Sequence, residues 1–558
     1  MTELSRRALL AGFTAASFAG MADQAACASG APLDALFING RIWDGTGRPS
    51  SLGAIGVRGG RIAAVGSAAM AAPRMRGTRL VDLKGRFVAP GFIDNHTHFV
   101  HGSLALGRVD LMGTRTPAEL AEAVGRAASA LPSGKWLLGW GWDAERWGGE
   151  LPGRALLDPV APDRPVALRR TDGHVMLVNS AALKLAGIDR NTPDPAGGLI
   201  LRDAAGQPTG ILKDMAVDLI EAVVPAPSEA DIDVAVRAGV SLALSKGVTQ
   251  VHGADLDWVA LQSFRRLRAK GEPGMRFYAL VPVQDWARLR DLIAVEGRGD
   301  DWVRWGGVKA LMDGSLGART ALFREPYADD PHNRGLTRQP MEVLRGWIEQ
   351  ADHAGFQVAC HSIGDDATSQ MLDILQGMIR KNGQRDRRFR VEHAQHIAPD
   401  VVPRFASLGA IASMQPYHAI DDGRWASKPL GPKRLHDAWP ARSLLDHGAC
   451  VTFGSDWPVA PLDPVGGIAA AVLRRTTDGQ FPGGFVPEQR VSVSEALTAY
   501  TRSNAYAGFQ EDRLGVLAPG KLADFVVLDN DPFEVSAEDL HRLRVVSTVV
   551  NGIERFAA

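Results

Sequence analysis

The sequence has little cysteine and no excess of either charge. It contains 3 cysteines in 558 residues, which are too few for a disulfide framework. Its 62 basic and 63 acidic residues give a formal net charge of −1. A chain with this balance has no domain-scale basic field to hold the phosphate backbone of a nucleic acid. We therefore expect a small-molecule substrate and no nucleic-acid partner.

Long hydrophobic runs are also scarce. Apart from the N-terminus, no apolar stretch is long enough to span a bilayer, so we expect no stable membrane anchor in the mature protein. With 45% hydrophobic and 22% charged residues, the composition is that of an ordinary globular protein. At roughly 150 residues per domain the length suggests three or four domains, although α/β barrels often exceed that size as one unit.

The first 28 residues are typical of an export signal. Arg6-Arg7 precedes the uncharged stretch 8–21, and Ala26-Cys27-Ala28 offers a cleavage site of the small-x-small type. The paired arginines resemble those of a twin-arginine signal. A frayed N-terminus or an uncleaved anchor is the alternative interpretation. We expect the twin-arginine machinery to export the protein to the periplasm or the medium.

The two ends of the chain have the same sequence pattern. Residues 33–90 contain short β-branched runs separated by glycine turns, and residues 520–528 and 545–550 repeat this pattern near the C-terminus. Because the termini of a domain often lie close in space, we predict one small β-sandwich domain built from residues 33–90 and 513–556.

The middle of the chain alternates strands and helices, which predicts an α/β fold. Eight strands are expected at 87–96, 247–252, 275–283, 305–312, 356–361, 389–393, 410–415 and 450–454. Eight units in βα order favour a closed (β/α)8 TIM barrel over residues 91–512. About 140 residues separate the first two strands. A structureless loop of that length is improbable, so we predict an inserted subdomain at about 104–240.

Two histidines end the first barrel strand. His96 and His98 are two residues apart, so both imidazoles point to the same face of the strand. Neutral imidazole is a common ligand of zinc-like ions. The pair alone is a weak signal, because a turn histidine beside a half-buried one would give the same pattern.

Four further polar residues fall at the ends of other predicted strands: Lys309, His361, His393 and Asp456. Barrel enzymes place their catalytic groups at this rim. A lysine inside an apolar strand is costly unless it is neutralised or paired, and a neutral amine can take up carbon dioxide to give a carbamate that bridges two metals. The six residues predict a two-metal site, although Lys309 could instead be salt-bridged and Asp456 could be a helix N-cap.

Several motifs carry a family resemblance. They are Pro-Gly-Phe-Ile-Asp-Asn-His-Thr-His at 90–98, Leu-Arg-Arg-Thr-Asp-Gly-His at 168–174, Val-Lys-Ala-Leu-Met-Asp-Gly-Ser at 308–315, Cys-His-Ser-Ile-Gly-Asp at 360–365, Arg-Val-Glu-His at 390–393 and Phe-Gly-Ser-Asp-Trp-Pro at 453–458. The chain resembles the metal-dependent amidohydrolase superfamily, and within it the family-3 branch that includes N-substituted formamide deformylase-like enzymes. The resemblance extends from about residue 33 to the C-terminus.

The resemblance implies a ligand set and a mechanism. The implied metal ligands are His96, His98, Lys309, His361, His393 and Asp456. The first two histidines would hold one divalent ion, the later two would hold a second, and carboxylated Lys309 would bridge them. Zinc suits these ligands, although manganese, iron or cobalt would also fit. Asp456 would accept a proton from the attacking water and deliver it to the leaving nitrogen.

The substrate contacts and the reaction each have more than one interpretation. Tentative substrate-binding residues are His174, Asp313, Arg319 and Trp142, and each also has a structural interpretation as a loop histidine, a mutual salt bridge or core packing. The leading hypothesis is a hydrolase of an amide, N-acyl or formamide C–N bond. The alternatives are an ester, carbamate or cyclic-amide hydrolase with the same site, and a non-enzymatic binding protein.

Overall fold

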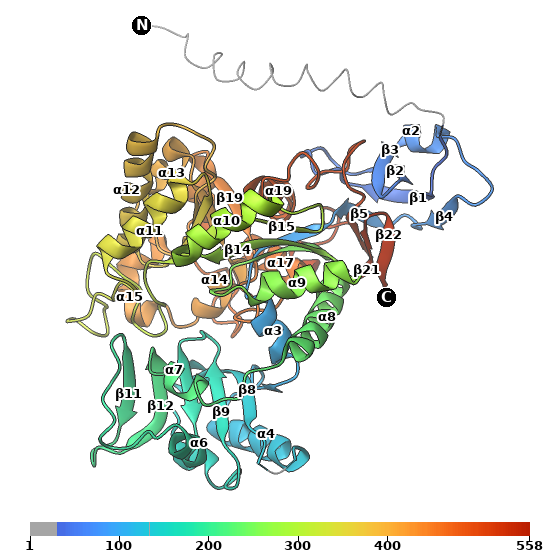
Figure 1. Cartoon of the computed structure of the whole chain (residues 1–558). Coiled ribbons are helices and arrows are strands. Elements are labelled where there is room, and N and C mark those ends of the chain that lie inside the picture. The colour runs from blue at the N-terminus through green and yellow to red at the C-terminus, as the bar shows by residue number, and fades with distance from the viewer. Residues whose placement is uncertain (1–30, 133) are drawn as a thin grey trace, which may run out of the picture.

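The computed structural model describes residues 31–132 and 134–558 (Figure 1). The predicted export signal lies outside these residues. None of the helices in the described part is long and apolar enough to cross a membrane.

Eight parallel strands form the central sheet, in the spatial order β19-β18-β17-β16-β15-β14-β13-β6. They are β6 Phe92–Thr97, β13 Val248–Gly253, β14 Arg276–Pro282, β15 Val303–Leu311, β16 Gln357–Ser362, β17 Arg390–His393, β18 Ile411–Met414 and β19 Cys450–Phe453. The first and last strands meet just beyond β19, where Thr97 bridges to Trp457 and Asp456 N donates to His96 O at 2.8 Å. The predicted α/β fold with an eight-stranded parallel barrel is confirmed.

The first expected strand is two strands. Residues 87–96 divide at Gly91 into β5 (Phe87–Pro90), which joins another sheet, and β6 of the barrel. A Cβ atom on Gly91 would lie 2.3 Å from Thr249 Oγ1, so only glycine fits where the chain passes from one sheet to the other. The apolar run hides this break, because strands on both sides of it are fully buried.

Helices surround the barrel and bury one face against it. They are α3 Phe99–Ala105, α8 Glu229–Ser245, α9 Val259–Ala269, α10 Trp286–Glu296, α11 Met341–His353, α12 Asp365–Asn382, α13 Val402–Leu408, α14 Pro416–Asp422, α15 Ser427–Arg434, α16 Ala441–Asp446, α17 Pro464–Leu473, α18 Val493–Tyr500 and α19 Arg502–Ala507. In α12 the buried residues Met371, Leu375 and Met378 recur at helical spacing. Capping boxes begin α8 at Ser228 and α18 at Ser492.

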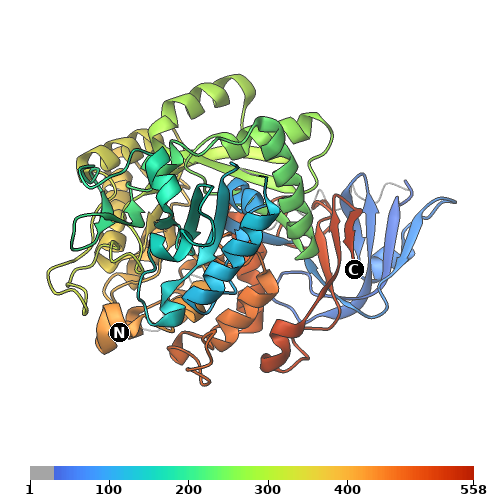
Figure 2. The ribbon, with the colours of Figure 1, turned by 90° about the horizontal axis from the view of Figure 1, so that it is seen from below.

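Strands from both ends of the chain form one sheet. Its order is β22-β21-β20-β5-β1-β2-β3, with β4 paired to β1. The strands are β1 Ala35–Ile42, β2 Ser51–Arg58, β3 Arg61–Val65, β4 Arg79–Asp82, β5, β20 Phe525–Leu528, β21 Val545–Val550 and β22 Ile553–Ala557, with helix α2 (Ser67–Ala71) beside β2 and β3. Figure 2 shows the blue and red strands side by side at one edge of the molecule. Buried Arg276, at the start of β14, pairs with Asp524 at 2.6 Å and ties this sheet to the barrel.

The residues between β6 and β13 contain a third sheet, with the order β11-β12-β10-β9-β8-β7. Its strands are β7 Val109–Asp110, β8 Leu137–Trp142, β9 Val166–Arg170, β10 Val175–Val178, β11 Gly198–Arg202 and β12 Pro208–Asp214, and its helices are α4 Pro117–Ala130, α5 Arg154–Leu157, α6 Ser180–Leu185 and α7 Asp218–Glu221. We call it the inserted sheet. It contacts loops that follow barrel strands, since Trp140 Nε1 donates to Pro458 O at 3.3 Å and Arg424 donates to Asp143 at 3.1 Å. It therefore lies at the rim where the barrel strands end.

Candidate metal centre

The six predicted ligands come from five barrel strands and the loops that follow them. His96 lies in β6, Lys309 in β15, His361 in β16 and His393 at the end of β17, while His98 and Asp456 directly follow β6 and β19. All but His98 are almost fully buried. Two of them have an unusual backbone conformation, because the φ angle is 72° at His393 and 63° at Asp456. Left-handed backbone at non-glycine residues is typical of functional sites, where packing holds a side chain in a required direction.

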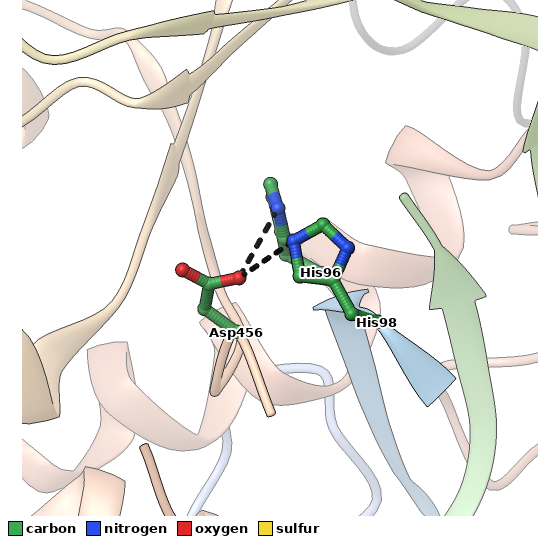
Figure 3. A group of neighbouring side chains, drawn as sticks. All are labelled: His96, His98 and Asp456. Atoms are coloured by element: carbon green, nitrogen blue, oxygen red, sulfur yellow. Dashed lines mark ion pairs between the residues drawn. The ribbon is translucent and has the colours of Figure 1, made fainter. Parts of the chain in front are cut away.

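One carboxylate oxygen faces two imidazoles (Figure 3). Asp456 Oδ1 lies 3.2 Å from His98 Nε2 and 3.5 Å from His96 Nε2. It is buried and has no hydrogen-bond partner among residues 31–132 and 134–558. Although burial raises it, the pKa of the Asp456 carboxyl is held well below its usual value by His96 and His98. A buried anionic oxygen that converges with two ring nitrogens fits a divalent cation.

Lys309 lies beside this group. Its Nζ is 3.2 Å from His96 Nε2, and the side chain is almost inaccessible to solvent. Burial lowers the pKa of Lys309. Burial and the nearby Lys309 also lower the pKa of His96 to about 4, so its imidazole is neutral at physiological pH. Neutral imidazole is the form that binds metal.

The other two histidines complete the ring of ligands. The ring centroid of His393 lies 4.4 Å from that of His361 and 4.8 Å from that of His96. His361 Nε2 bonds Gly314 O at 3.0 Å, which leaves Nδ1 free for a ligand, whereas His393 Nδ1 bonds Gln415 Oε1 at 2.9 Å, which leaves Nε2. Burial lowers the pKa of both imidazoles well below the usual value. Both are therefore available as neutral ligands.

Two carboxylates that sequence reasoning missed lie beside the first two histidines. Glu392 is fully buried and bonds His96 Nδ1, while Asp255 Oδ1 lies 3.8 Å from His98 Nδ1 and 3.5 Å from His101 Nδ1. Both Asp255 oxygens are buried without a hydrogen-bond partner in the described part of the chain. A carboxylate behind a ligating histidine fixes the ring and raises its basicity as a ligand. The only signal for Glu392 was its place in Arg-Val-Glu-His, and Asp255 carried none.

Asp255→Asn should weaken metal binding about 10- to 100-fold, because the uncharged amide supports the His98 ring less strongly. The measurement is competitive titration of zinc against a chromogenic chelator. Asp478→Asn, at an exposed residue that is not part of the cavity lining, is the matched control and should bind like the wild type. Equal affinity of Asp255→Asn and the wild type would show that Asp255 does not support a ligand.

His418 is a further addition to the site. It lies in α14, and its Nε2 is buried, lacks a hydrogen-bond partner among the described residues and is 3.8 Å from Asp456 Oδ2. The groups whose ligand atoms lie close enough to share a metal ion are His96/His98/Asp456, His393/His418/Asp456 and His98/His101/Asp255. The geometry thus places His101 and His418 next to the predicted ligands.

A cavity of about 840 Å³ opens beside these residues. Tryptophans and aliphatic side chains form part of its wall, and the inserted sheet contributes Trp140, Arg170 and His174. Its volume is within the range of pockets that enclose small molecules of drug size. Cys360, which precedes His361, faces away and contacts Met371 of α12 at 3.5 Å. Burial raises the pKa of its thiol, which excludes it as a nucleophile.

Two of the four tentative substrate contacts lie at the cavity. His174 lines it. Asp313 borders it but is buried, and its carboxylate accepts hydrogen bonds from the backbone of Leu322, Ile363 and Gly364 at 2.9–3.0 Å. Burial raises the pKa of Asp313 to about 7, even though these hydrogen bonds oppose the shift. These hydrogen bonds of Asp313 hold the loop that follows β15 against the residues that follow β16.

The predictions for Trp142 and Arg319 need correction. Trp142 is fully buried in the core of the inserted sheet and donates to Leu168 O at 2.8 Å. Gly141 has a φ of 94° and the register shifts there, so Trp140 and Trp142 no longer share a face, and Trp140 lines the cavity. Arg319 pairs with Asp329 at 2.6 Å and not with Asp313, and it lies behind the cavity wall, where it donates to the carbonyl oxygens of the lining residues Leu316 and Gly317.

Fold and site together define an α/β barrel with a candidate metal-binding centre at the ends of its strands. A model of the amidohydrolase family matches residues 79–554, and the chain belongs to this family. It is therefore a hydrolase of carbon–nitrogen bonds. The predicted resemblance is confirmed.

Individual relatives agree with this assignment. The chain is 39% identical to Protein LONG AFTER FAR-RED 3 of Arabidopsis thaliana, over 94% of this chain and 92% of that protein. It is 36% identical to the putative amidohydrolase YtcJ of Bacillus subtilis (85% and 90%) and 30% identical to the N-substituted formamide deformylase of Arthrobacter pascens (94% and 98%). An uncharacterized metal-dependent hydrolase from Pyrococcus horikoshii OT3 superposes with a TM-score of 0.75 at 29% identity, covering 90% of this chain and 99% of that one.

Proposed function

We propose that the protein hydrolyses an amide, N-acyl or formamide C–N bond of a small molecule, with a metal-activated water and Asp456 as general base. The observation that carries the proposal is the buried Oδ1 of Asp456, which has no hydrogen-bond partner in the described part of the chain and lies 3.2 and 3.5 Å from two imidazole nitrogens. The 30% identity to an N-substituted formamide deformylase over almost the whole chain supports this class of substrate.

The residues fit one or two divalent ions, of which zinc suits the ligands best. His96 and His98 would hold the first ion, and His361 and His393 would hold the second. Carboxylated Lys309 would bridge them, and burial, which lowers the pKa of this amine, favours the neutral form that reacts with carbon dioxide. When bound, such an ion lowers the pKa of water and polarises a carbonyl oxygen.

Asp456 has the position and charge of a general base. Its Oδ2 lies 3.9 Å from His393 Nδ1 and 3.8 Å from His418 Nε2, so the carboxylate stands between the two halves of the ligand ring. It takes the proton of the attacking water as that water adds to the carbonyl carbon. Its protonated form is one source of the proton that the leaving nitrogen requires.

The remaining parts of the chain form two further domains around this site. We propose that the inserted sheet forms a subdomain at about 104–240 that closes the mouth of the 91–512 barrel and shapes the substrate cavity. Residues 33–90 and 513–556 would form the terminal β-domain. We further propose export through the twin-arginine route, on the basis of Arg6-Arg7 and the uncharged stretch that follows it.

A substrate panel tests the reaction class. Metal-loaded protein is incubated with N-acyl amino acids, formamides and aryl amides, and with esters, carbamates and cyclic amides of the same acyl groups. We expect kcat/KM to be greatest for an acyclic amide, N-acyl or formamide compound. Turnover confined to esters, carbamates or cyclic amides would replace this proposal with the alternative hydrolase, and tight binding without turnover would identify a binding protein.

A further inference from the structure

The inserted sheet presents an imidazole, backed by a carboxylate, to the cavity. His174 follows β9 in a turn closed by Gly173, lines the cavity and is about one-fifth exposed. Its Nδ1 hydrogen-bonds Asp214 Oδ1 at 2.8 Å. Because Nδ1 is engaged, Nε2 is the ring nitrogen that remains for a ligand. A histidine oriented in this way by a carboxylate is a common acid–base arrangement.

Asp214 is itself held in place from two sides. Arg338 Nη1 donates to Asp214 Oδ1 at 3.1 Å, and the Asp214 backbone nitrogen donates to His174 O at 2.8 Å. Its side chain is only 8% exposed, and its φ of 48° places it in the left-handed region. Such strain persists only where surrounding contacts enforce it, and it is concentrated at functional sites. The imidazole therefore has a fixed direction.

A chain of hydrogen bonds connects this pair to the metal centre. Arg338 N donates to Met312 O at 2.9 Å, and Met312 N donates to His361 O at 3.0 Å. Arg338 thus anchors Asp214 to the strand that carries one of the metal ligands. His174 and His361 both line the cavity.

We propose that His174 is the general acid that protonates the leaving nitrogen, an inference that rests on the proposed function. When the C–N bond of the tetrahedral intermediate breaks, its electron pair passes to nitrogen. The imidazolium of His174 gives its Nε2 proton to that nitrogen and becomes neutral, while Asp456 has taken the proton of the attacking water. Solvent then removes the proton from Asp456 and returns one to His174, so the cycle consumes one water and releases the acid and the amine.

The test is the dependence of kcat on the leaving group. Anilides with the acyl group of the best panel substrate are compared from 4-methoxyanilide to 4-nitroanilide, for wild type and His174→Gln. Glutamine keeps an N–H donor but cannot transfer a proton. We expect a loss of about 10²- to 10³-fold for 4-methoxyanilide and of less than about 10-fold for 4-nitroanilide, whose nitrogen leaves with less need of an acid. Asp214→Asn, at a positioning residue, should show the same trend with a smaller loss and an unchanged KM.

Two measurements separate this role from others. His353→Gln, on the exposed end of α11, is the control and should match the wild type on every anilide. Metal content of His174→Gln should equal that of the wild type. An equal loss across the series would assign His174 to stabilising the oxyanion, and loss of metal would make it a ligand; either result overturns the proposal while leaving C–N hydrolysis intact. A wild-type protein that cleaves no amide would refute the proposed function and this inference together.

Discussion

Asp456→Asn should lower kcat by about 10³-fold and leave the metal content unchanged. Asparagine has nearly the same shape but cannot accept the proton of the attacking water, and general-base catalysis typically contributes 10²- to 10⁴-fold. The four buried or partly buried imidazoles of the ligand ring remain to hold the ion. The measurements are kcat on the best panel substrate and metal content by mass spectrometry.

Asp478→Asn, which changes an exposed aspartate of the same domain, is the control and should have the kcat of the wild type. A normal kcat for Asp456→Asn would refute the general-base assignment. Loss of both turnover and metal would show that Asp456 acts chiefly as a ligand.

Arg390→Met should lower the free energy of unfolding by about 3–5 kcal/mol. Arg390 is fully buried in β17 and donates from Nε to Glu392 Oε1 at 2.6 Å. Although burial raises it, the pKa of Glu392 is held well below its usual value by Arg390 and His96, so the carboxylate is charged. Removal of the guanidinium leaves that charge buried without its main partner. Urea denaturation of the metal-free protein measures the effect.

Two variants test the cause of this loss. Arg390→Met combined with Glu392→Leu should recover part of the stability, because the uncompensated charge is gone. Arg404→Met breaks a pair with Asp373 that is largely exposed, and it should cost less than about 1 kcal/mol. A similar small cost for Arg390→Met would contradict the role of this buried pair.

The sequence predicts the barrel, and the position of the candidate ligands at the ends of its strands, because both depend on local patterns. Each barrel strand is a short apolar run, and Lys309, His361, His393 and Asp456 lie in or just after such runs. Parallel strands in a barrel bring those ends together regardless of the details of packing. The motifs at 90–98 and 453–458 then connect the two ends of the sheet, where Asp456 N donates to His96 O at 2.8 Å.

What the sequence does not predict depends on tertiary contacts or on single backbone angles. Asp255 lies near His98 only because β13 pairs with β6 in the folded barrel, and this pairing cannot be seen in the sequence around Asp255. Because Gly141 has a positive φ, Trp140 lines the cavity while Trp142 is buried in the core of the inserted sheet, and strand alternation cannot predict this difference. Arg319 was predicted to contact the substrate, with a salt bridge to Asp313 as the alternative, but the loop after β15 folds so that Asp329 is its partner.

The central claim is that metal held by these residues is required for hydrolysis. Its most direct test is to measure metal content and turnover of one purified sample before chelation, after chelation and after readdition of zinc. We expect one or two equivalents of divalent metal at the start, loss of at least about 99% of turnover on removal, and recovery on readdition. Metal-free protein with full turnover would contradict the account.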